Sequence, residues 1–110
     1  MPRFAFKLEY DGSRFDGWPD VQAALEAALV KTGAEASNLT AAEPTEAGVH
    51  ASSQIVHLDL PDARNPLALS SDLADALHGT ALAIVGASAV PDSFDARAAT
   101  ERHYTYRLFS

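Results

Sequence analysis

A loop near the middle of the chain, residues 42–51 with the sequence AEPTEAGVHA, carries two side chains of the kinds that enzymes use for nucleophilic and acid–base chemistry. Glu46 stands two residues before Gly48, and His50 stands two residues after it. A turn needs only the glycine or the proline of this stretch. A carboxylate and an imidazole around it are more specific than a turn requires. The loop is therefore a candidate catalytic loop, or the remains of one.

A second stretch, residues 9–18 with the sequence EYDGSRFDGW, combines two glycines with aromatic side chains and Arg14. Aromatic and basic side chains on a loop could stack on an unstacked base and hold its phosphate. They could equally anchor the loop on the hydrophobic core. From this stretch alone we favour the anchor, and Arg14 stays a candidate contact for a nucleic acid.

Other kinds of site find little support in the sequence. The four histidines (His50, His57, His78 and His103) lack the i+3 or i+4 spacing of a metal site, so no metal is expected. The chain has no cysteine, which excludes disulfides and zinc sites built on thiolates. It also has no Walker phosphate-binding loop, no GxGxxG motif of dinucleotide-binding proteins and no GxSxG motif of hydrolases. No cofactor is predicted.

Composition sets broader limits. A chain of 110 residues with 47% hydrophobic side chains fits one domain, 1–110, with a single core. Fifteen acidic residues against eight basic ones give a formal charge of −7, which opposes binding to the phosphates of a nucleic acid. The first residues, MPRFAFKLEY, lack the long apolar stretch typical of a secretory leader, and no apolar run reaches the length of a membrane span. We expect a cytoplasmic protein without a membrane partner.

Hydrophobic periodicity predicts the elements that must position the loops. Period-two patterns indicate strands at 4–10, 36–42 (the weakest), 54–60 and 103–108, and a largely apolar run indicates one at 81–90. Helical spacing indicates one helix from an N-cap at Asp20 to a stop at Gly33, and another from Asn65-Pro66 to His78-Gly79. In the strand at 54–60, His57 and Asp59 are expected on the face opposite the apolar side chains. The fold class is α+β: a ferredoxin-like β-α-β-β-α-β sandwich with one extra C-terminal strand, a mainly antiparallel sheet and two helices on one face.

Five blocks of sequence resemble, in order, the N-terminal half of the TruA-type tRNA pseudouridine synthases. They are YDGSRFxGW from residue 10, VQxALxxAL from 21, TxAGVHAxxQ from 45, FxAR from 94 and RHYxYR from 102. The resemblance implies the fold described above and an isomerase that reattaches uracil to its ribose through carbon in the tRNA anticodon arm. It implies no metal or organic cofactor. It places Glu46 and Tyr104 at catalytic positions and Arg14, Arg97 and His50 at substrate-binding positions.

The chain departs from the family where the family's chemistry takes place. The family's loop reads GRTDAGVHA, so Glu43 replaces a glycine, Pro44 an arginine and Glu46 the catalytic aspartate. Glu46 keeps the carboxylate, but its extra methylene moves the oxygens by more than about 1 Å, and a misplacement of about 1 Å can cost about a hundredfold in rate. Pro44 removes a cation that would position the nucleotide. A family loop after Trp18 that grips tRNA is shortened here, and the spacing after Arg97 is one residue short.

These departures favour a catalytically inactive, stand-alone scaffold, engineered or decayed, over an active enzyme. The family continues into a second half after the position of Ser110, and its members act as dimers on tRNA. One alternative is a tRNA uridine isomerase acting on the anticodon arm. Another is a module that forms homodimers through a sheet edge or face left exposed without that second half. Binding to tRNA is expected to be weak or absent.

Overall fold

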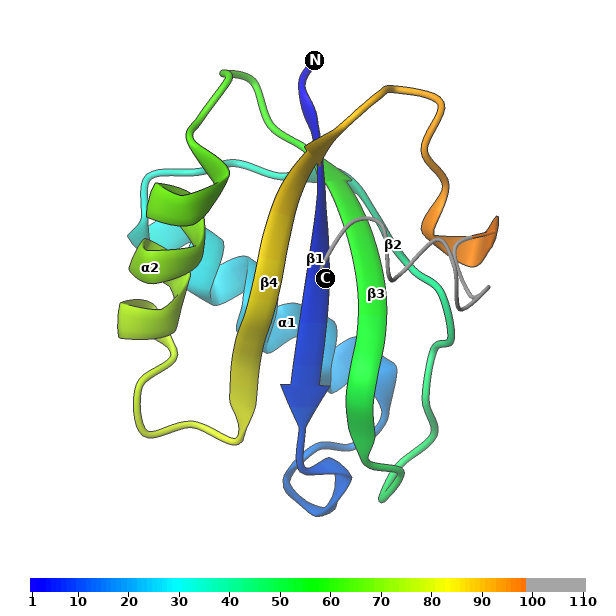
Figure 1. Cartoon of the computed structure of the whole chain (residues 1–110). Coiled ribbons are helices and arrows are strands. Elements are labelled where there is room, and N and C mark those ends of the chain that lie inside the picture. The colour runs from blue at the N-terminus through cyan, green and yellow to red at the C-terminus, as the bar shows by residue number, and fades with distance from the viewer. Residues whose placement is uncertain (99–110) are drawn as a thin grey trace.

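The computed structural model describes residues 1–98 and shows one antiparallel sheet of four strands in the order β2-β3-β1-β4 (Figure 1). The ferredoxin-like α+β class is confirmed, whereas the predicted strand at 103–108 lies outside the described residues. Along the chain, the helices and strands come in the predicted order. They are β1 (Arg3–Tyr10), α1 (Trp18–Lys31), β2 (Ser37–Ala41), β3 (Ala51–Asp59), α2 (Pro66–Ala76) and β4 (Leu82–Val90), with short 3-10 helices η1 (Gly12–Arg14) and η2 (Ala96–Ala98).

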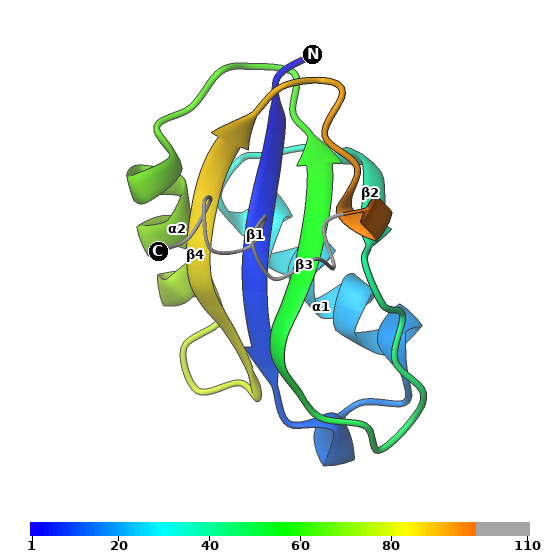
Figure 2. The ribbon, with the colours of Figure 1, turned by 45° about the vertical axis from the view of Figure 1, so that its right-hand side comes forward.

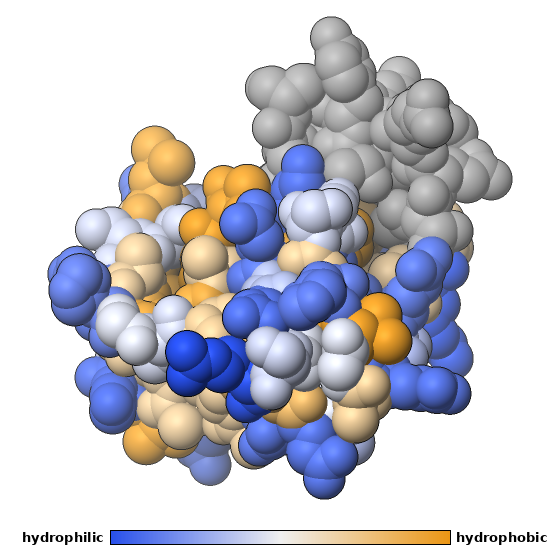
Figure 3. All heavy atoms as spheres, turned by 90° about the horizontal axis from the view of Figure 1, so that it is seen from below, coloured by the Kyte–Doolittle hydropathy of each residue, from blue (hydrophilic) through white to orange (hydrophobic). Residues whose placement is uncertain are grey.

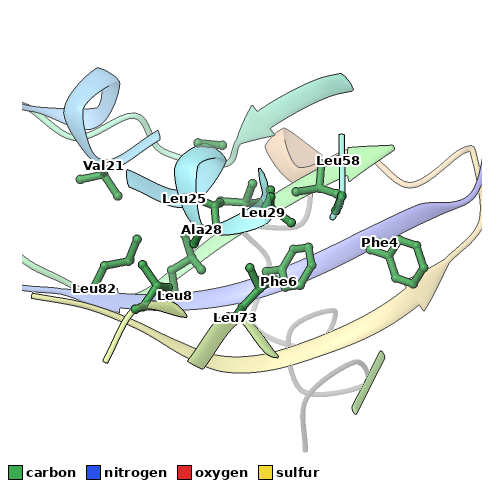
Figure 4. Close-up of a cluster of buried hydrophobic side chains, with 14 of the residues drawn as sticks. Phe4, Phe6, Leu8, Val21, Leu25, Ala28, Leu29, Leu58, Leu73 and Leu82 are labelled. Carbon is green, nitrogen blue, oxygen red and sulfur yellow. The ribbon is translucent and has the colours of Figure 1, made fainter. Parts of the chain in front are cut away.

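The core lies between the sheet and the two helices. Phe4, Phe6 and Leu8 alternate along β1 and point toward α1, which crosses behind the sheet (Figures 1, 2 and 4). The predicted stripe of α1, Val21, Leu25, Ala28 and Leu29, is buried against them, as are Leu69, Leu73 and Leu77 of the α2 region. No helix within residues 1–98 has the length and apolar character to cross a membrane.

The start of α1 differs from the prediction. The helix begins at Trp18 with Gly17 as its N-cap, and Asp20 lies in its first turn. Gly17 has φ of 79°, a conformation that glycine adopts without steric cost, and Pro19 is tolerated in the first turn because its missing N–H would have no helical partner. The Asp20 carboxylate instead accepts a hydrogen bond from the Asp16 N–H, at 3.1 Å.

The start of α2 agrees with the prediction. The Asn65 side chain accepts hydrogen bonds from the N–H groups of Leu67 and Ala68, and Pro66 occupies the first helical position. These bonds satisfy two of the backbone donors that a helix start leaves without intrahelical partners.

The predicted polar face of β3 is buried. His57 is 5% exposed and Asp59 is 6% exposed, although both lie on the face of the sheet opposite the helices. Residues 91–98, which follow β4, cover that part of the sheet: Phe94 and Ala96 form a second small core with Ala5 and Ile55. Because this cover comes from a distant part of the chain, alternation within β3 could not reveal it.

Candidate functional site

The two loops that the sequence singles out separately lie together at one end of the sheet, the lower end in Figure 1. Residues 11–17 follow β1 and residues 43–50 precede β3. The Gly48 N–H donates to the Gly12 carbonyl at 3.2 Å, and the Trp18 N–H donates to the Thr45 carbonyl at 2.8 Å. We call these two segments the docked loops. As the anchor prediction requires, the aromatic side chains of residues 9–18 pack on the main core: Trp18 is buried in it and Phe15 packs against it.

Buried polar side chains hold the start of residues 43–50. The Gln54 amide accepts from the Glu43 N–H at 3.1 Å and donates to the Glu43 carbonyl, so it fixes both backbone groups of that residue. The Tyr10 and Thr45 hydroxyls are 2.6 Å apart and share a hydrogen bond. Gln54 is 4% exposed on β3. Two sequence signals point to Gln54: it is an amide at the start of the apolar strand, and it matches the last position of the block TxAGVHAxxQ.

Gly12 is required by close approach of the two backbones. A Cβ atom at this position would lie 2.0 Å from the Val49 carbonyl oxygen and 2.2 Å from its carbon. No side chain can rotate away to relieve such a contact, because both neighbouring atoms belong to the backbone. The docked arrangement therefore depends on a glycine at residue 12.

His50 joins the loops through its ring. Its Nδ1 accepts a hydrogen bond from the Gly12 N–H at 2.9 Å and lies 3.1 Å from Oδ1 of Asp11. One nitrogen cannot both accept from Gly12 and donate to Asp11, and the first contact requires a neutral ring with its proton on Nε2. The Ser13 hydroxyl and N–H both donate to the Asp11 carboxylate, which lowers the pKa of Asp11. His50 therefore has a structural role in this loop.

The three positions that depart from the family's loop all present their side chains to solvent. Glu43, Pro44 and Glu46 are exposed, and within residues 1–98 the Glu46 carboxylate has no hydrogen-bond or ion-pair partner. The turn after Glu46 closes through its backbone, since its carbonyl accepts from the Val49 N–H at 3.1 Å. The structure thus holds the backbone of the loop, while no side-chain contact within residues 1–98 orients the Glu46 carboxylate.

The remaining predicted site residues are spread over other segments. Arg14 is exposed on η1, beside the docked loops. Arg97 is exposed on η2, which packs near β2 and β3, and it forms a two-pronged ion pair with Asp95 at 3.0 and 3.2 Å. That pairing raises the pKa of Arg97 and lowers that of Asp95. Tyr104 lies outside the described residues.

A shallow hollow of about 620 Å³ opens beside the docked loops, between the end of β1 and the starts of β3 and β4. Its polar lining comes from Glu9, Asp11, His50, Ser52 and Thr80, and Glu46 is not among its lining residues. Viewed from below, this end of the molecule is mainly hydrophilic with scattered apolar side chains (Figure 3). Within residues 1–98, no three His, Asp or Glu side chains are arranged to hold a metal ion.

These features define an α+β domain of ferredoxin-like fold with a docked loop pair at one end of its sheet. Comparison with known proteins confirms the resemblance seen in the sequence: the chain matches, over its full length, an N-terminal half of TruA-type tRNA pseudouridine synthases. No protein-family model matches the chain.

Three of the similar proteins are each named tRNA pseudouridine synthase A. That of Mesorhizobium japonicum is 47% identical over 121 residues, covering 100% of this chain and 48% of the relative. Those of Methylobacterium radiotolerans and Allorhizobium ampelinum are 44% and 45% identical over all of this chain and 46% of their own length. The chain thus spans about half the length of the curated relatives it matches. Because the first alignment runs over 121 residues against 110 in this chain, that relative has residues within the matched region that this chain lacks.

Proposed function

We propose that this chain is a non-catalytic domain built on the N-terminal half of a tRNA pseudouridine synthase, decayed or engineered, in which the loop architecture is kept and the chemistry is lost. One observation carries the proposal: the residues that dock the loops and those that depart from the family's loop are separate sets. The docking contacts use Tyr10, Gly12, Thr45, His50 and Gln54, all at positions that match the family's pattern.

The residues that depart from the family's loop, Glu43, Pro44 and Glu46, support the loss of catalytic activity. A carboxylate that acts on a nucleotide must be held in one place, because misplacement by about 1 Å can cost about a hundredfold in rate. Glu46 is longer than aspartate, is exposed, and has no partner within residues 1–98 to orient it. Pro44 supplies no cation at the place where the family's pattern has arginine. These replacements cost the fold little, because all three side chains point to solvent.

Weak binding of tRNA belongs to the same proposal. The formal charge of −7 repels a polyanion, and much of the affinity for nucleic acids comes from lysine and arginine side chains that neutralise phosphates. Of the two predicted arginine contacts, Arg97 is already paired with Asp95. Arg14 alone would add little to the affinity for tRNA.

The test is an assay of pseudouridine formation in an unmodified tRNA transcript. We expect no product from this chain or from the Pro44→Arg/Glu46→Asp variant, while a full-length tRNA pseudouridine synthase A run in parallel gives product. Filter binding at low salt should show weak or undetectable retention of tRNA for both. Product from the unaltered chain would establish the alternative, a tRNA uridine isomerase, and product from the variant alone would show that the two side chains are the whole defect.

A second candidate, a homodimerising module, is favoured by the exposed apolar edge of the sheet. In the part of the chain that the structure describes, β4 pairs with β1 on one side only, its sequence LAIVGASAV carries no charge, and Leu82 is its only buried residue. An uncharged edge strand is a template for pairing with a second copy. Sedimentation equilibrium should then give a dimer that Val85→Lys dissociates, since Val85 is 50% exposed on this strand. A monomer at all concentrations would reject this candidate.

A further inference from the structure

Residues 91–98 are fastened to the face of the sheet that the helices leave open. Phe94 and Ala96 are 2% and 0% exposed and pack against Ala5 and Ile55. The Phe94 ring also meets the His57 ring edge to face, with ring centres 6.2 Å apart and planes at 84°. This segment is held independently of the main core between sheet and helices.

Two side chains of the sheet clamp the backbone of this segment. The Nδ1 atom of His57 accepts a hydrogen bond from the Ala96 N–H at 2.9 Å, in a buried setting. The Arg3 guanidinium donates to the Phe94 carbonyl at 2.7 Å, while its other nitrogens donate to the Asp59 carboxylate at 2.8 and 3.1 Å. The position of the segment therefore depends on one neutral acceptor and one charged donor.

The clamp at His57 requires one protonation state. Nδ1 can accept only when the ring is neutral and carries its proton on Nε2. A proton on Nδ1 would face the Ala96 N–H, leaving two donors against each other and a charge in a setting only 5% exposed. Such an arrangement is costly, because neither donor has an acceptor and the charge is desolvated.

The charged groups around His57 come from each element packed on it. Arg3 on β1 and Arg97 on η2 oppose a positive ring, whereas Asp59 on β3 and Asp95 before η2 favour it. The neighbour on β2 is Thr40, which is uncharged. Burial is the largest influence and, with Arg3, lowers the pKa of His57 below its ordinary value of 6.5.

We propose that His57 is a proton-controlled latch, which holds residues 91–98 on the open face of the sheet when neutral and releases them when protonated. The inference is independent of the function proposed above, because it concerns a face and a segment away from the docked loops.

The pH dependence of the release of residues 91–98 follows from the linkage between proton binding and release. When the segment is released, His57 faces water and takes up a proton near its ordinary pKa of 6.5; when latched, it resists protonation. The stabilisation of the latched form by His57 is therefore fully present above about pH 6.5. It weakens as pH falls, because the released form binds the proton more tightly. Between 6.5 and the lower native pKa, the ratio of released to latched forms rises by about tenfold per pH unit.

The test follows hydrogen exchange of individual backbone amides by NMR from about pH 8 to about pH 5, after correction for the intrinsic pH dependence of exchange. We expect the protection of the Ala96 amide to fall by about tenfold per pH unit below about pH 6.5, while amides of β1 and α1 keep theirs. In His57→Asn, the side-chain oxygen can replace Nδ1 as acceptor but does not titrate. Its Ala96 protection should be independent of pH. His78→Asn is the matched control, because His78 is exposed and takes no part in the contacts described here, and it should behave as the unaltered chain.

Two results would overturn the latch. One is an Ala96 amide whose protection in the unaltered chain does not change over this range. The other is the same acid-dependent loss in His57→Asn, which would place the sensitivity in other groups. If His57→Asn does not fold, the ¹⁵N shifts of the His57 ring in the unaltered chain decide: a protonated Nδ1 coexisting with a protected Ala96 amide contradicts the proposal.

Discussion

Gly12→Ala is expected to lower the free energy of unfolding by about 3 kcal/mol, the upper end of the usual cost of overpacking. The new methyl group would overlap the carbonyl of Val49, with atoms 2.0 and 2.2 Å away. Because the overlap is with backbone, residues 43–50 must move, and the bonds from Gly12 to Gly48 and His50 are then lost. In a domain of this size the melting temperature should drop by roughly 10 °C or more.

The control for this variant is Gly33→Ala. Gly33 has φ of 78°, so alanine is strained there, but nothing lies within 4 Å of the added methyl group. Its cost should be about 1 kcal/mol. Chemical denaturation of both variants compares steric overlap with backbone strain. Equal losses would mean that residues 43–50 do not press on Gly12 as the structure shows.

Asp59→Asn is expected to cost about 2 kcal/mol at neutral pH. The buried Asp59 side chain accepts hydrogen bonds from Arg3 at 2.8 and 3.1 Å and from Asn38 at 2.8 Å. The Arg3 bond is the main cause that lowers the pKa of Asp59 from 3.8 to about 2. A shift of this size corresponds to roughly 2 kcal/mol of differential stability between the charged and neutral forms. Asparagine keeps the shape of the side chain and loses the charge.

The pH dependence of that difference has a definite sign. A carboxylate with a depressed native pKa contributes its full stability above the unfolded value of 3.8, and the contribution is lost as pH falls toward about 2. The unfolding free energies of Asp59→Asn and the unaltered chain should therefore converge between about pH 4 and 2. Asp72→Asn, at an exposed position on α2, should stay within about 0.5 kcal/mol throughout. A constant difference for Asp59→Asn down to about pH 2 would show that its charge is not the stabilising feature.

Much of the fold follows from local patterns in the sequence. The alternation of Phe4, Phe6 and Leu8 sets β1, and Asn65 with Pro66 sets the start of α2, because the forces involved act within one element. The predicted N-cap at Asp20 is wrong, because Gly17 can adopt a positive φ and so begins the helix earlier. His57 and Asp59 lie on the face opposite the apolar side chains, as predicted, but the sequence does not reveal that a segment about forty residues away buries them.

In the candidate site, too, the sequence predicts local features but not contacts between distant segments. The sequence places Glu46, His50 and Arg14 on loops. In the structure Glu46 and His50 are on a loop, whereas Arg14 ends the short 3-10 helix η1. The sequence could not show that the two loops dock, because the hydrogen bonds of Gly12 to Gly48 and His50 join positions 36 and 38 residues apart. It also could not assign His50 a structural role, since that depends on which atom meets Nδ1. The catalytic and binding roles that the resemblance implies for Glu46, Tyr104, Arg14, Arg97 and His50 stay predictions.

The most direct test of the central claim, that the docked loops keep their architecture without the chemistry, is release of tritium from tRNA labelled at C5 of uracil. Forming the carbon–carbon bond of pseudouridine displaces that hydrogen, so each turnover appears as tritium in water. With this chain in excess over tRNA, so that a single turnover suffices, we predict release no faster than from tRNA alone. Release above that background by the unaltered chain, abolished in Glu46→Gln, would contradict the account and make Glu46 a catalytic residue.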